Sequence, residues 1–472
     1  GAGDNVVIAS TVSVYPTSQC NNITIQSGGI LQNRSSNSYT LFVNGNLNNQ
    51  GVIQNSTYSL TVNVKGNVNN SGSMTNGTLS FTGTANQQMS STQPLHVDNF
   101  VRTAGSGRIL ATTNLSFVGT AIDLNSDTLE FTTGTALTID GGNLTDGVMF
   151  RTAMPALQIT TDNGTHVNNF TIDSQEARLY GTLLVFGSAN TFKHNVINFG
   201  TLKSQNNNSY SLTVDGNLTN NGIIENGAYS FTVNISGDLT NNGTWQNYNT
   251  VLNGSGIQNL TMTQPYSGTL FTKNNTAGRA RALSGLSFVN TEIDLKTDTL
   301  EIATASAISL DGGNLRNGVI SKSSLPAIQL TGDNNAYFYI LTIDAPQTEL
   351  NGSLFIYGSS NNFKTNVINN ATLKSHPSNS YTLTVDGSLI NHGVIQNGNY
   401  NFTINVSGNL SNNGTWENYN TVLNGSGAQN LAMTQPYSGA YFTKNLSGGR
   451  AKATAGLSFS GTQIDFQNDT LE

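Results

Sequence analysis

The sequence predicts an all-β protein, a parallel β-solenoid (β-helix) with three short strands per coil of about 21 residues, built from 171-residue tandem units. Three observations lead to this prediction. Apolar residues alternate with Thr, Ser and Asn along most of the chain, as in strands with one buried face. Matched side chains recur at a step of 21, and whole segments recur at a step of 171. The same alternation excludes an all-α or α/β fold.

The composition limits the possible functions. Only 10% of the 472 residues are charged, the net charge is −7, and the basic residues are scattered, which argues against a nucleic-acid partner. Long apolar runs are absent, so no membrane span is expected. Abundant Asn and Thr with few Lys predict a secreted protein, located extracellularly or at the cell surface. The single cysteine, Cys20, cannot form an internal disulfide and is expected to be buried, with a cross-link between chains as the alternative.

The long repeat keeps its register over all its landmarks. Asn-Ser-Tyr-Thr-Leu at 37–41 returns as Asn-Ser-Tyr-Ser-Leu at 208–212 and as Asn-Ser-Tyr-Thr-Leu at 379–383, a step of 171 each time. The register predicts four parts: residues 1–38 as the N-terminal part of the first unit, repeat units at 39–209 and 210–380, and a partial unit at 381–472. Because the last copy stops where the preceding copy continues into another strand, we expect the chain to be a piece of something longer.

The short repeat lies inside the long one. Gly-Asn-Leu-Thr-Asn-Asn-Gly at 216–222 recurs as Gly-Asp-Leu-Thr-Asn-Asn-Gly at 237–243, a step of 21. Written in this register, several side chains should stack on their copies: Leu212 on Val233, Val214 on Ile235, Leu218 on Leu239, Ile224 on Trp245, Asn221 on Asn242 and Asn226 on Asn247. We expect apolar ladders inside the coils and asparagine side chains that hydrogen-bond to their copies above and below.

Each coil shows three short runs separated by Gly or Asn-Gly, which supply corners that need positive φ. Identical positions one turn apart would then lie at the inter-strand distance of about 4.8 Å. A string of β-sandwiches also has frequent turns, but its strands differ from one another, and a step of 21 with matched side chains has no origin there. The solenoid is therefore preferred.

No catalytic motif is carried by the repeat. The five histidines are His96, His166, His194, His376 and His392, and none of them recurs in another copy. A general base that repeats with the units is therefore excluded for histidine, and nothing marks a site present once. We predict that the protein is not an enzyme and holds no catalytic, cofactor-binding or metal-binding residues.

Three acidic positions do recur: Asp123, Asp127 and Glu130, with second copies Asp294, Asp298 and Glu301 and third copies Asp465, Asp469 and Glu472. The order Asp123-x-Asn125-x-Asp127 resembles a calcium loop, but Thr128 stands where such a loop needs glycine, and Lys296 replaces Asn125 in the second copy. We expect a turn and a solvated strand face rather than a cation site. Asp-Gly-Gly-Asn at 140–143 and 311–314 is likewise interpreted as a corner.

Other surface features have competing interpretations. A set of tyrosines could stack on sugars, although packing over the corners is favoured because the step from Tyr210 to Tyr229 is 19 rather than 21. The set is Tyr39, Tyr58, Tyr210, Tyr229, Tyr381 and Tyr400. Repeated Thr is a weak argument for an ice-binding face. Asn-x-Ser/Thr triplets that could accept glycans include Asn22, Asn55, Asn114, Asn217, Asn234, Asn259, Asn401 and Asn405.

Three phrases resemble those of a known class of proteins. They are Asn-Gly-Ser-Gly-Ile-Gln-Asn-Leu at 253–260 with its copy at 424–431, the Gly-Asn-Leu-Thr-Asn-Asn-Gly coils, and the opening Gly-Asp-Asn-Val-Val-Ile at 3–8. They look like the repetitive surface proteins of Bacteroidota, large secreted adhesins and fibre proteins that are often exported by the type IX system. The resemblance implies surface attachment or fibre formation.

The sequence thus predicts an extracellular structural or adhesive fibre protein, a rigid β-solenoid rod with no cofactor. Unpaired strand edges at open coil ends make end-to-end stacking with other copies of itself a further hypothesis. Surface glycans are possible additional partners. The alternative is a polysaccharide-binding or polysaccharide-cleaving β-helix protein.

Overall fold

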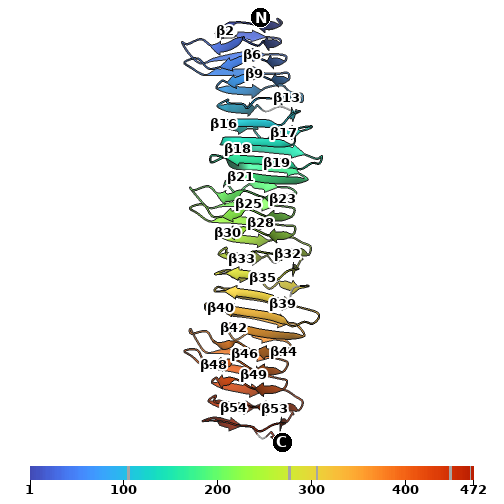
Figure 1. The fold of residues 1–472 in the computed structure, drawn as a ribbon, viewed down its shortest axis with the longest axis vertical. Helices are drawn as coiled ribbons and strands as arrows, with labels where there is room; N and C mark the ends of the chain where they lie inside the picture. Colours follow the sequence, from blue (N-terminus) through green and yellow to red (C-terminus); the bar gives the residue numbers. More distant parts are fainter. Residues whose placement is uncertain (17, 104–106, 275–277, 305–306, 446–448, 468) are drawn as a thin grey trace. The chain divides into compact units, whose positions relative to one another are not determined.

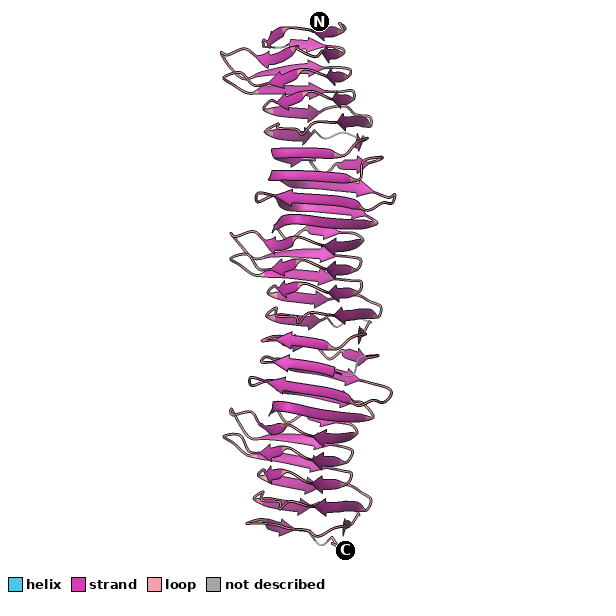
Figure 2. Cartoon of the chain, in the orientation of Figure 1, coloured by secondary structure: helices cyan, strands magenta, loops and turns pink. Residues whose placement is uncertain are grey.

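The computed structural model describes residues 1–472 except 17, 104–106, 275–277, 305–306, 446–448 and 468. Every regular element among the described residues is a β-strand, and the strands pair in parallel, so the predicted all-β parallel solenoid is confirmed (Figures 1 and 2). The described part of the chain contains no helix long and apolar enough to cross a membrane. The chain forms two compact units, Gly1–Gly237 and Asp238–Glu472, and their boundary falls inside the predicted unit 210–380.

The first unit shows the three-strand coil most clearly. One coil consists of β6 (Tyr39–Val43), β7 (Leu47–Asn49) and β8 (Val52–Gln54), and the next of β9 (Leu60–Val64), β10 (Val68–Asn70) and β11 (Ser73–Thr75). Tyr39 pairs with Leu60, Leu47 with Val68, and Val52 with Ser73, so each partner stands one short repeat further along the chain. Every strand thus pairs with the matching strand of the next coil.

The predicted side-chain stacks are present in the same unit. β25 (Tyr210–Val214) pairs with β28 (Phe231–Ile235), which places Leu212 opposite Val233 and Val214 opposite Ile235. All four side chains are completely buried. The apolar ladder inside the coils is therefore confirmed at these positions.

The coils that lie between the short-strand coils of β6–β11 and those of β25–β28 have longer strands than predicted. In the first unit β16 (Leu115–Asp123) and β18 (Ala136–Arg151) each cover two faces of the coil. Gly141 and Gly142 of the predicted corner have φ of 69° and 85°, a conformation open to glycine, and they turn the chain there. The ladder continues on both sides, with Val118 opposite Asp140 and Thr120 opposite Gly142. The 140–143 corner is confirmed, although it does not interrupt the strand.

The second unit repeats this arrangement. Its long strands are β39 (Asn314–Ser321), β41 (Tyr337–Asp344) and β42 (Gln347–Tyr357), and short three-strand coils follow them from β46 (Tyr381–Val385) onward. The bounds of β6, β25 and β46 are separated by one long repeat at each step. The tandem repeat is therefore visible in the strands themselves.

Buried asparagines form polar ladders beside the apolar core. In the second unit the Asn369 amide donates to Asn391 Oδ1 (2.8 Å), and the Asn391 amide donates to Asn412 Oδ1 (3.0 Å). All three side chains are fully buried. The sequence predicted such hydrogen bonds and placed one row at Asn221. Asn221 is exposed, whereas the preceding residue, Asn220, faces inward and is fully buried. Cys20, at the end of β3 (Ser18–Cys20), is buried as predicted.

Candidate functional site

The repeated acidic residues face buried cations. Arg102 at the end of β14 (Asn99–Arg102) is 0% exposed, and its Nε lies 2.8 Å from Asp127 Oδ2. The second and third copies hold lysine in place of this arginine: Lys273 lies 3.0 Å from Asp298, and Lys444 lies 3.2 Å from Asp469. The positive charge is thus kept in all three copies while the side chain changes.

Each buried cation also closes a corner of the solenoid. The Arg102 guanidinium donates to Gly107 O (2.7 Å) and to the Gln87 side chain. Lys444 Nζ donates to the carbonyl oxygens of Gly425 and Asn445, at 3.2 Å each. The bonds to Gln87 and Gly425 reach the preceding coil, whereas those to Gly107 and Asn445 are local. The cation and its aspartate therefore act as an internal cross-link between coils.

The prediction of a solvated strand face for Asp127 is wrong, because its carboxylate is the counter-ion of Arg102. The predicted turn is confirmed: Asp123 Oδ1 accepts a hydrogen bond from Asn125 N (2.9 Å). Glu130 pairs with Arg108 at the surface (2.9 Å). Among the described residues, no group of three or more His, Cys, Asp or Glu side chains is placed to hold a metal ion.

Asp294, the second copy of Asp123, is the most tightly held of these acids. It accepts hydrogen bonds from Lys296 N (3.0 Å), Arg316 (3.0 Å) and Asn317 Nδ2 (3.1 Å), and its side chain is 4% exposed. Burial alone would raise its pKa, but the hydrogen bonds from Lys296 and Asn317 and the charge of Arg316 outweigh burial, so the pKa is lowered.

This lowered pKa predicts a stability change in acid. A carboxylate with a depressed folded-state pKa stabilises the fold above its unfolded pKa of about 3.9, and this contribution is lost as the pH falls through the folded pKa. We expect Asp294→Asn to flatten the fall of the urea midpoint as the pH is lowered below about 4. The matched control is Asp465→Asn, the exposed third copy. Equal acid profiles for Asp294→Asn and the parent chain would contradict this prediction.

The histidines lie in different surroundings. His96 and His392 are exposed, and His194 lies 3.3 Å from Asp173. Burial lowers the pKa of both His166 and His376. His376 Nδ1 bonds to Ser378 Oγ (2.9 Å), and its ring packs on that of Tyr357 (4.7 Å between centroids).

The tyrosines considered from the sequence form two groups. Tyr39, Tyr210 and Tyr381 bond through their hydroxyls to the residue three positions earlier, at 2.8–2.9 Å. The other group is about half exposed: Tyr58, Tyr229 and Tyr400. Tyr210 stands opposite Phe231, so it does not share a ladder position with Tyr229, in agreement with their spacing in the sequence.

Two of the possible glycan acceptors already use their carboxamides within the fold. Asn22 Nδ2 donates to Asn5 Oδ1 (2.8 Å). Asn55 Oδ1 accepts from Leu60 N and Gly77 N, both at 2.8 Å. At these two triplets the asparagine therefore has a structural role.

A cluster of surface rings was not foreseen. Its members, called the ring cluster below, are Tyr337 and Tyr339 on β41, Tyr357 on β42, His376, and Tyr381 on β46. Ring centroids are 4.8 Å apart for Tyr339 and Tyr357 and 5.3 Å apart for Tyr357 and Tyr381. The sequence signal is Tyr-x-Tyr at 337–339, which puts both rings on one face of a strand.

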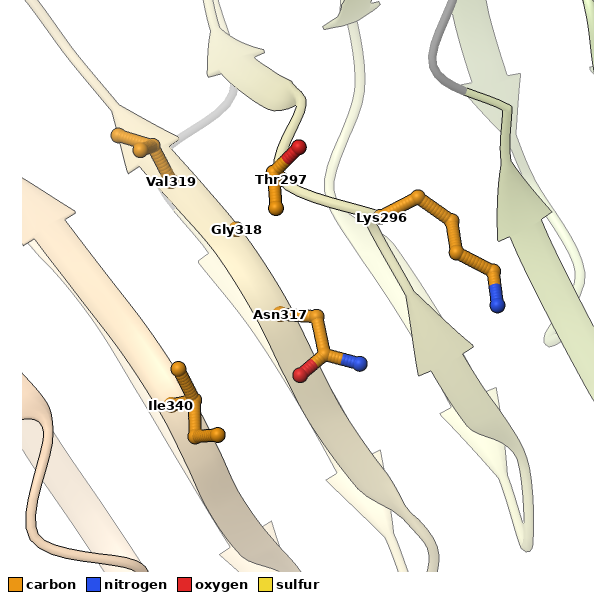
Figure 3. A pocket seen from close by; sticks show the side chains of 6 residues that line it. All are labelled: Lys296, Thr297, Asn317, Gly318, Val319 and Ile340. Carbon is orange, nitrogen blue, oxygen red and sulfur yellow. The ribbon is translucent and has the colours of Figure 1, made fainter.

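A pocket of about 600 Å³ adjoins the ring cluster. Figure 3 shows its lining side chains on neighbouring strands and turns: Lys296, Thr297, Asn317, Gly318, Val319 and Ile340. A Cβ added at Gly358 would lie 3.2 Å from the Tyr339 ring and 3.8 Å from Ile340 Cγ1. The side chains of Tyr339 and Ile340 therefore both lie next to Gly358. Tyr339 belongs to the ring cluster and Ile340 lines the pocket, so these two residues make the cluster and the pocket contiguous.

No protein-family model, curated protein or solved structure matches this chain. Its function must therefore be argued from the site itself. The pocket and the ring cluster combine aromatic faces, an apolar side chain and amide and hydroxyl groups, a combination suited to binding a ligand.

Proposed function

We propose that the protein is an extracellular structural or adhesive solenoid whose coils form a constant scaffold for variable surfaces. The observation that carries this proposal is the contrast between interior and exterior. Leu31, Leu202 and Leu373 occupy equivalent positions in successive copies of the long repeat, and all are buried. At the surface, by contrast, Asn169 of the first unit becomes Ile340 in the second. Equivalent inward positions stay buried even where the residue type changes, as from Met74 to Trp245 and Trp416. A recurring buried interior with changing outward residues suits a protein that displays contacts along its length.

A surface location is testable on intact cells of the source organism. We expect an antibody raised against the purified chain to label unpermeabilised cells, and we expect added protease to remove the signal. Labelling that requires permeabilisation would overturn the proposed location. The resemblance to repetitive surface proteins of Bacteroidota supports the proposed surface location and suggests the type IX system as the export route.

Self-association is a further part of the proposal. The strands of a coil pair with those of the next coil through their backbone N–H and C=O groups. A coil from another copy of the protein carries the same groups and can pair in the same way. Electron microscopy of the purified protein should then show filaments with an axial repeat on the order of 38 Å, about eight coils at the strand spacing. Separate particles at all concentrations would contradict end-to-end stacking.

A second candidate function, polysaccharide binding, is favoured by the ring cluster. Cleavage would need two acids that flank a glycosidic bond. Three acids near the pocket are all in ion pairs: Glu292 and Asp294 with Arg316, and Asp298 with Lys273. Binding is therefore the better supported form of this alternative.

A further inference from the structure

We propose that the pocket of Figure 3 and the adjoining ring cluster form a binding site for an uncharged polysaccharide chain. This inference rests on the proposed adhesive function, for which it names a site and a class of ligand. Three independent features of the second unit carry it: a strained apolar residue, a row of partly exposed rings, and a balance of charge.

The strained residue is Ile340. Its φ is 50°, in the left-handed region that β-branched residues avoid, and the residue, which lines the pocket, is 42% exposed. Asn169, the equivalent residue of the first unit, has the same φ of 50°, which suits asparagine. Isoleucine here therefore costs stability twice, through its backbone and through its exposed apolar surface. Such rule-breaking residues occur where function requires them.

Thr297 repeats the pattern on the opposite side of the pocket. It is β-branched, and its φ is 72°, whereas Ser126 holds the equivalent place in the first unit with a φ of 66°. Two left-handed β-branched residues thus line one depression of about 600 Å³. The strain is concentrated at the pocket walls.

The rings continue the apolar surface beyond Ile340. Tyr339 lies beside Ile340 over Gly358, and its ring is 4.8 Å from that of Tyr357, with an angle of 34° between the ring planes. Aromatic faces on successive coils offer stacking positions for the C–H faces of successive sugar rings. The hydroxyl of Thr297 and the amide of Asn317 supply polar groups at the same pocket for sugar hydroxyls.

The charges around the pocket select an uncharged ligand. Two cations, Lys296 and Arg316, face two carboxylates, Glu292 and Asp294. Lys296 and Arg316 each lie 3.0 Å from Asp294. This group carries no net charge, so an acidic polysaccharide would gain no counter-ion there.

The test is affinity electrophoresis of the purified chain in gels that contain a soluble β-glucan, a galactomannan or an α-glucan, with polygalacturonate as the acidic comparison. We expect at least one uncharged polysaccharide to retard the protein. The double variant Tyr339→Asn/Ile340→Asn restores the Asn168–Asn169 pair of the first unit and should weaken binding at least tenfold. The matched control Tyr58→Ala removes an exposed ring of the first unit and should bind like the parent chain.

Stability separates a binding role from a folding defect. Ile340→Asn should raise the urea midpoint while it weakens binding, because asparagine tolerates the left-handed backbone. Tyr357→Ala provides a second test of binding if the double variant does not fold. The proposal is overturned if no uncharged polysaccharide retards the chain, if polygalacturonate alone does so, or if folded variants bind like the parent. These results would leave labelling of intact cells unaffected, whereas binding without surface labelling would overturn the adhesive function alone.

Discussion

Asp127→Asn is expected to lower the free energy of unfolding by about 3–5 kcal/mol. The substitution removes the counter-ion of Arg102, whose side chain is 0% exposed, and leaves a buried guanidinium without a carboxylate. Removing one partner of a buried pair costs more than the pair itself contributes, because the remaining charge cannot return to water. Urea unfolding followed by circular dichroism at neutral pH measures the loss.

The control for this substitution lies three residues along the chain. Glu130→Gln breaks the surface pair with Arg108, whose side chain is 48% exposed, and should cost at most about 1 kcal/mol. Replacing Arg102 and Asp127 together by leucine should recover part of the loss, since no unpaired charge then stays buried. The recovery is incomplete because Gly107 O and Gln87 lose the donor that Arg102 supplies. Similar losses for Asp127→Asn and Glu130→Gln would show that the buried pair has no special role.

Asn418→Leu is expected to lower the free energy of unfolding by about 1–3 kcal/mol for each buried donor that loses its hydrogen-bond acceptor. Trp416 Nε1 (3.1 Å) and Thr421 Oγ1 (3.2 Å) both donate to Asn418 Oδ1, and both side chains are fully buried. Tyr437 OH lies 2.9 Å from the same oxygen. The loss in urea unfolding should therefore be among the largest for any single polar residue of the second unit.

The first unit contains a matched control for Asn418. Asn76 occupies the equivalent position, but Met74, Leu79 and Leu95 replace the tryptophan, threonine and tyrosine, and Asn76 Oδ1 is buried without a hydrogen-bond partner among the described residues. Asn76→Leu loses only the bonds of its amide nitrogen, such as that to Thr78 O (2.8 Å). It should lower the free energy of unfolding clearly less than Asn418→Leu does. Equal losses would contradict the role of Asn418 Oδ1 as the shared acceptor.

The fold was predictable because it follows from local periodicity. The stacks of Leu212 on Val233 and of Val214 on Ile235 require only the short repeat, and both are present. The long strands were not predicted because a corner made by Gly141 and Gly142 turns the chain without ending the ladder. Periodicity alone does not distinguish a corner that ends a strand from one that bends it.

The candidate site was less accessible from the sequence. The partner of Asp127 was missed because Arg102 becomes lysine in the other copies, although a positive charge at 102, 273 and 444 was a usable signal. The ring cluster was missed because the step from Tyr337 to Tyr357 is 20 and the step from Tyr357 to Tyr381 is 24, so neither fits a step of 21. Coils of unequal length bring these rings together only in three dimensions.

The pairing of each strand with its copy in the next coil also has a consequence for how the chain folds. Leu47 pairs with Val68 and Leu389 with Leu410, so contacts join residues only 21 positions apart in a chain of 472. Such a relative contact order is low for a parallel sheet, and the entropy lost in closing each loop is small. We therefore expect vectorial folding, in which each new coil adds to the last completed one as the chain emerges from the ribosome.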